Sequence, residues 1–192
     1  MKLRMVISSV MVTGLTAGLC SAGDSPDQKR EKIRKMANET LNELYKEQPA
    51  ARGAIQASVG YAVFANLGTK ILLVSTAHGS GVAVNSKTKN ETFMKMFSAG
   101  GGLGVGVKDY RVIFAFENDA AMAKFLDSGW SGSAEADAAA KTKKGGGAYT
   151  GAANVDEGVW AYQITKKGLA LDATLQGTKY SKDDDLNNPQ KK

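Results

Sequence analysis

The chain has 192 residues, with 25 Lys and Arg against 19 Asp and Glu, one His, one Cys and a formal net charge of +6. A single cysteine excludes an internal disulfide and a thiolate metal site, and a single histidine excludes histidine metal clusters. The mild basic excess permits an anionic partner without demanding one, and we expect no nucleic acid partner and no cofactor.

Residues 1–22 have the layout of a secretory signal peptide. Lys2 and Arg4 precede an uncharged run that continues to Leu19 and leads into small residues. A single membrane anchor is the alternative on length alone, but the Ser, Thr and Gly content and the small-residue exit favour cleavage. Removing Lys2 and Arg4 lowers the net charge of +6 by two, to +4.

Cys20 raises a second possibility at the cleavage site. In lipoproteins a small residue normally precedes the acylated cysteine, whereas here Leu19 stands at that position. Cleavage after Ala22 or Gly23 is therefore favoured over acylation of Cys20. We expect an exported protein, periplasmic or secreted and possibly membrane-associated.

The residues after the leader begin with a helical pattern. Ser25 followed by Pro26 is a helix start, and apolar residues at helical spacing predict an amphipathic helix over 26–47 that ends before Pro49. A second, short helix is expected over 50–58. A third helix should follow the cap at Asn118 and Asp119, with Met122, Phe125 and Leu126 on one face.

The remaining pattern is one of short apolar runs between Gly and Asn residues, which indicates strands. The runs are 61–65, 70–77, 81–85, 91–97, 103–107, 110–116 and 133–138, followed by a hairpin formed by 159–165 and 169–176. Residues 141–147 form a basic loop by composition, and 183–192 a polar, disordered tail.

Many short strands at close intervals predict a curved, mostly antiparallel sheet or partly closed barrel. With the N-terminal helices and one further short helix packed on it, the fold class is α+β. Residues 23–182 are long enough for a single domain.

Catalytic and nucleotide-binding motifs are not supported. His78 precedes Gly79 at the end of an apolar run and is interpreted as a polar turn residue rather than a catalytic base. The glycine run 100–106 has neither dinucleotide-binding spacing nor a following helix, so its glycines are assigned to strand bending. Asp183, Asp184 and Asp185 lack the alternating spacing of a calcium loop.

Four ordered blocks of the sequence resemble the SYLF domain. They are GYAVFAN at 60–66, the glycine-rich pair at 100–118, Phe125-Leu126 with GSAEADA at 132–138, and Lys167-Gly168-Leu169 with LQGT at 175–178. The resemblance covers about 25–182. One departure is that the family often ends in a Tyr-Tyr-Gly segment, whereas this chain ends in acidic and polar residues.

The resemblance implies a non-enzymatic module that binds acidic phospholipids, with the N-terminal amphipathic helix contacting the membrane. Fungal members are also described as actin-binding. Bacterial members are typically small exported proteins or lipoproteins, for which phosphatidylglycerol or cardiolipin would be the ligand.

The expected helix carries its own physical argument for an anionic membrane partner. Around Glu31 it has five basic residues and two apolar ones that could anchor in lipid: Lys29, Arg30, Lys32, Ile33, Arg34, Lys35 and Met36. Each basic residue near an anionic surface contributes on the order of 1 kcal/mol. A second candidate cluster is Lys141, Lys143 and Lys144 in the glycine-rich loop.

Two alternatives remain open from the sequence. The apolar stripe of the helix could instead pack on the protein's own sheet, leaving the basic residues as a solvated face. The chain could also be a protein-interaction module for an envelope or host partner, including actin by analogy, and an enzyme is the third class.

Overall fold

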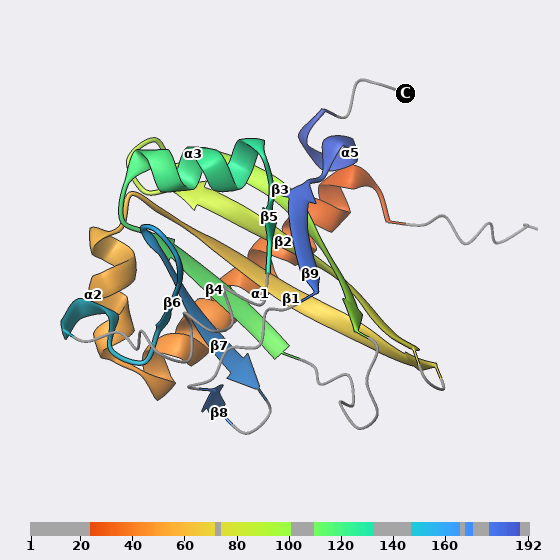
Figure 1. Cartoon of the computed structure of the whole chain (residues 1–192). Helices are drawn as coiled ribbons and strands as arrows, with labels where there is room; N and C mark the ends of the chain where they lie inside the picture. The colour runs from red at the N-terminus through yellow and green to blue at the C-terminus, as the bar shows by residue number, and fades with distance from the viewer. Residues whose placement is uncertain are drawn as a thin grey trace, which may run out of the picture.

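The computed structural model describes residues 24–71, 74–100, 110–132, 147–165, 168–170 and 177–188. Their main feature is a curled, entirely antiparallel sheet that forms a half-barrel (Figure 1). The strand order is β5-β9-β3-β2-β1-β4-β7-β6, with β8 beside β7. The strands are β1 Gly60–Ile71, β2 Val74–Asn85, β3 Glu91–Gly100, β4 Tyr110–Phe116, β5 Trp130–Ser131, β6 Ala153–Asp156, β7 Val159–Thr165, β8 Gly168–Ala170 and β9 Thr178–Lys182.

Two helices cover the outer face of this sheet. Helix α1, Pro26–Glu47, begins with a full capping box in which the Ser25 side chain accepts from the backbone of Gln28 and the Gln28 side chain accepts from the backbone of Ser25. It is followed by α2, Ala50–Ala57. Both lie where the sequence predicts them, and α1 runs behind the sheet in Figure 1.

At β4 the sheet is buried on both faces, which explains the unbroken apolar sequence of this strand. Val112, Phe114 and Phe116 point to the inside of the curl, whereas Ile113 and Ala115 point to the outer face. On the outer face the latter two pack with the buried stripe of α1 and α2, which includes Ile33, Ala37, Leu41, Leu44 and Ile55. Side-chain alternation along a strand therefore serves two cores at once.

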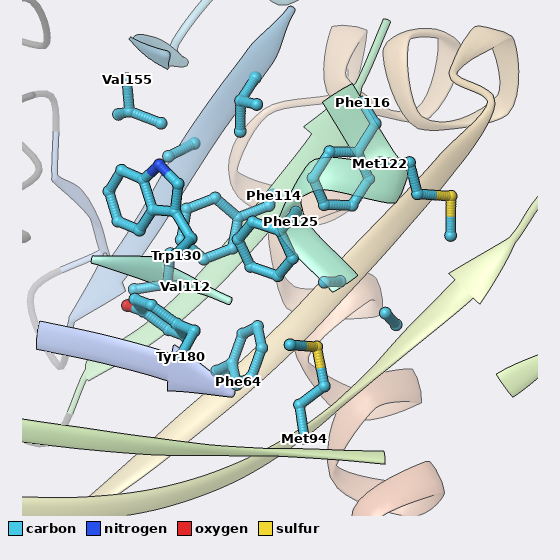
Figure 2. Packing of buried hydrophobic residues seen from close by; sticks show 14 of the residues in the cluster. Phe64, Met94, Val112, Phe114, Phe116, Met122, Phe125, Trp130, Val155 and Tyr180 are labelled. Atoms are coloured by element: carbon cyan, nitrogen blue, oxygen red, sulfur yellow. The ribbon is translucent and has the colours of Figure 1, made fainter. Parts of the chain in front are cut away.

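An aromatic cluster fills the inside of the curl (Figure 2). The rings of Tyr180 on β9 and Phe114 on β4 are 5.1 Å apart, although β3, β2 and β1 lie between their strands in the sheet. In a flat sheet these strands would be roughly 19 Å apart, at about 4.8 Å for each step. The contact is therefore possible only because the sheet curls.

Helix α3, Asp119–Asp127, is packed into this inner cluster through Met122 and Phe125. Asn118 caps it by accepting from the backbone of Ala121 at 2.8 Å. This confirms the predicted third helix, and the α+β class with a curled antiparallel sheet is confirmed as well.

The strand boundaries differ from the prediction at β2. The sequence suggests separate strands over 70–77 and 81–85, but β1 continues to Ile71 and β2 runs unbroken over Val74–Asn85. Gly79 and Gly81 lie within β2 and do not end it. They allow β1 and β2 to approach closely, since a side chain at either position would overlap the neighbouring backbone of β1. Strands β6 and β9 were not predicted.

The expected disorder of 183–192 is wrong for its first residues. Asp183 caps a short helix, α5 Asp184–Asn187, whose Leu186 is buried in the outer core. The Asn187 side chain accepts from the Phe93 backbone at 2.9 Å and donates to its carbonyl at 2.7 Å. The Asp-rich sequence is thus a helix start, and the tail is held against β3.

Several predictions fall outside the described residues. These are the signal peptide 1–22 with Cys20, the strands 103–107 and 133–138, most of the second hairpin strand 169–176, and residues 189–192.

Among the described residues of the outer core, the phenol of Tyr162 is buried without a hydrogen-bond partner. Burial, with smaller contributions from Tyr149 and Tyr45, raises its pKa to about 12 from the ordinary value of 10.0. The neutral phenol is therefore favoured in the folded state.

Replacing Tyr162 by Phe should raise the free energy of unfolding by up to about 1 kcal/mol at neutral pH, because an unsatisfied hydroxyl is removed. Between pH 10 and about 12 the wild type loses stability as the unfolded chain releases this proton first. The gap between the two proteins should therefore widen over that range in urea titrations. A loss of stability at neutral pH in Tyr162→Phe would contradict the proposed lack of a partner.

Candidate functional site

The N-terminal half of α1 is fixed to β3 and α5 by two arginines. Arg34 forms an ion pair with Glu91 at 2.8 Å, and the hydrogen bond that Arg34 donates to the Glu91 carboxylate raises the pKa of Arg34. Arg30 pairs with Asp27 and donates to the Leu186 carbonyl at 2.9 Å. Both arginines are thereby engaged within the protein.

The Phe93 ring lies beneath both guanidinium groups. Its centroid is 6.0 Å from the Cζ of Arg30 and 5.4 Å from that of Arg34. The Arg30 side chain is only 16% exposed. These two members of the predicted basic cluster therefore stabilise the helix against the sheet, and Arg30 is in addition poorly exposed to a ligand.

The lysines of α1 are more accessible. Lys32 lies 2.6 Å from Asp24, while Lys29 and Lys35 are exposed and form no ion pair with any residue that the structure describes. On a helical wheel Lys35 lies opposite the buried stripe, so it points away from the sheet. In the N-terminal half of this helix, the positive charge without an ion-pair partner among the described residues thus resides on Lys29 and Lys35.

The two apolar residues of the predicted cluster face the protein. Ile33 is 5% exposed within the outer core, and Met36 is partly buried against the same core. The hypothesis that Ile33 anchors in lipid is wrong for this conformation, because the hydrophobic stripe of α1 is used by the sheet. Basic residues that face outward remain compatible with lipid contact.

The other predicted residues divide into two groups. Lys141, Lys143 and Lys144 lie outside the described residues. His78, expected in a turn, lies instead within β2, where its exposed ring is 5.1 Å from that of Phe97.

Sequence reasoning missed an exposed part of the sheet's outer face. Phe97 is 42% exposed, and beside it lie Lys95 on β3 and Lys179 on β9. The available signal was the alternation of β3, in which Met94 and Met96 point inward while Lys95 and Phe97 point outward. This signal could not show that α1 leaves the position uncovered.

Among the residues that can be described, no group of three or more His, Cys, Asp or Glu side chains could hold a metal ion. For Asp156, burial would raise the pKa, but hydrogen bonds from Lys124 at 3.0 Å and from the Glu157 backbone outweigh it and lower the pKa. This pair joins α3 to β6 and is structural.

In the described part of the chain, no helix has the length and apolar content needed to cross a membrane. The architecture is an α+β half-barrel with a packed interior and charged side chains on its helices and strands.

Residues 97–189 match the family model Ysc84, described as "Las17-binding protein actin regulator". The chain is 39% identical over 159 residues to beta cell expansion factor A of Aeromonas veronii, an alignment that covers 83% of this chain and 59% of that relative. The chain is similar to members of the SYLF family, the family that its ordered sequence blocks resemble.

The similarity bears on function only at a coarse level. The SYLF family is known for binding domains rather than enzymes, which supports a binding module of the lipid-binding or actin-regulator type. The chain spans about three fifths of the length of the relative that it matches.

Proposed function

We propose that this protein is a non-enzymatic module of the cell envelope that binds anionic phospholipid head groups through basic residues of α1. The observation that carries the proposal is the exposure of Lys29 and Lys35 on a helix whose apolar stripe is already buried. Such a helix lies on a bilayer without unfolding, and its lysines bind phosphates at the surface. Export to the periplasm or the medium, through the leader 1–22, belongs to the same proposal.

The contacts of α1 dictate how the proposal is tested. Neutralising all five basic residues would also remove the Arg34–Glu91 and Arg30–Leu186 contacts and weaken the fold. The informative variant is therefore Lys29→Gln with Lys35→Gln. Lys46→Gln with Lys89→Gln is the matched control, because both lysines are exposed and lie outside the N-terminal half of α1, Lys46 in the last turn of the helix and Lys89 between β2 and β3.

We expect Lys29→Gln/Lys35→Gln to weaken binding to phosphatidylglycerol-containing vesicles by about tenfold or more, since each lysine contributes about 1 kcal/mol. Co-sedimentation with vesicles at low salt measures this, and added salt should reduce wild-type binding. Equal affinity of the wild type for pure phosphatidylcholine and for anionic vesicles, or no binding to either, would rule out the electrostatic mechanism.

A second candidate function is favoured by the printed description of the family model, which names an actin regulator that binds Las17. In that case the protein would be an interaction module for an envelope or host protein. Saturable binding to purified actin, with indifference to vesicle charge, would support this candidate over the first.

A further inference from the structure

Part of the sheet's outer face extends beyond the cover of α1. The helix crosses β3 at Phe93, beneath Arg30 and Arg34. Phe97 follows four residues later on the same face, about 13 Å further along the strand. Figure 1 shows the β1–β2 hairpin also continuing past α1.

This uncovered face carries an unusual combination of side chains, here called the Phe97 surface: His78, Lys95, Phe97 and Lys179. His78 and Lys179 are the partners of Phe97 in the neighbouring strands β2 and β9, and Lys95 precedes it by two residues. Phe97 is the one large hydrophobic side chain that is exposed in the part of the chain described.

The charges of the Phe97 surface are free. Lys95 and Lys179 are exposed, and neither takes part in an ion pair among the described residues. Among the positions whose side chains the structure describes, the other outer-face residues of these strands beyond Phe93 are Ser80 and Ser181, so no carboxylate among them offsets the lysines. In α1, by contrast, both arginines and Lys32 have acidic partners.

We propose that the Phe97 surface is a second membrane-contact site, in which the Phe97 ring enters the interfacial region of an anionic bilayer while Lys95 and Lys179 bind head-group phosphates. The inference rests on the proposed function and assigns it a further site. Charge complementarity selects the occupant, since an aromatic ring flanked by free cations matches a surface that is anionic outside and apolar beneath. A second copy would bring like-charged lysines together.

Affinity measurements test the site. Phe97→Ser should weaken binding to vesicles of phosphatidylglycerol and phosphatidylcholine by about fivefold, because half-exposed apolar area is no longer buried in lipid. Lys95→Gln/Lys179→Gln should weaken it by about tenfold or more. Phe97→Leu should retain most of the affinity, and Lys46→Gln/Lys89→Gln should match the wild type.

A second measurement reports insertion directly. In Phe97→Trp the added indole should shift its emission to the blue on anionic vesicles and be quenched by lipids brominated on their acyl chains. The wild type, whose Trp130 is buried and Trp160 half-buried, provides the baseline.

The possible outcomes distinguish failure of the Phe97 surface as a site from failure of the proposed lipid-binding function. If the wild type fails to bind anionic vesicles, the proposed function and this site are overturned together. If the wild type binds and the Phe97 surface variants bind equally well, only the site is overturned. The site is also overturned if Phe97→Ser converts a wild-type dimer to a monomer in sedimentation velocity while lipid affinity is unchanged.

Discussion

Replacing Phe114 by Ala should lower the free energy of unfolding by about 4 kcal/mol, the largest effect of any single substitution considered for this fold. Phe114 is fully buried at the centre of the inner cluster (Figure 2). Its ring lies 5.1 Å from Phe125, 5.1 Å from Tyr180 and 5.5 Å from Trp130. Truncation therefore removes apolar burial and leaves a cavity where the curled sheet and α3 meet.

Urea unfolding followed by circular dichroism measures this loss. Phe97→Ala is the matched control, because the same truncation at a side chain that is 42% exposed on the outer face should cost less than about 1 kcal/mol. Similar losses in the two variants would mean that the inner cluster does not hold the curl together.

Local sequence signals predicted the helices well because each has its determinants nearby in the chain. Ser25, Pro26 and the apolar stripe define α1, and Asn118 defines the start of α3. The signals are hydrogen bonds and side-chain spacing within a few residues, which the sequence displays directly.

Features that depend on distant partners were not predictable in the same way. Strand β9 pairs with β3, more than eighty positions earlier in the chain, and its neighbour α5 is held by Phe93 and Arg30. Asp183 is a typical residue for a helix start, but the polar composition of the tail led to a prediction of disorder. Pairing across such separations is set by packing, which a local pattern does not contain.

The candidate site likewise depends on contacts between residues that are distant in the chain. The sequence identified a basic cluster on α1 but could not tell which residues have partners, since Glu91 and Leu186 reach the helix only through the fold. It also could not show that the outer face at Phe97 is left uncovered. The structure thus reduces the predicted basic cluster of α1 to Lys29 and Lys35 as candidate lipid-binding residues. It also reveals the Phe97 surface on β2, β3 and β9.

Gly81→Ala should be the second most damaging substitution, with an expected loss of about 3 kcal/mol. Gly81 on β2 is paired directly with Phe64 on β1, and the Phe64 side chain points to the inside of the curl. A side chain at position 81 would point to the same side. A Cβ at this position would overlap the Phe64 ring and the backbone carbonyl oxygen of Val63. Because the backbone cannot yield without separating the two central strands, the methyl group must distort the sheet.

Gly53→Ala is the matched control for this substitution. Gly53 lies in α2, and a Cβ there would meet no atom within 4 Å. The same chemical change should therefore raise stability by roughly 0.5–1 kcal/mol, because alanine favours the helix. Opposite signs for the two variants in urea unfolding are the expected result. A neutral Gly81→Ala would show that β1 and β2 can separate at little cost, and the close packing of Phe64 over the glycine would then not be what holds the curl.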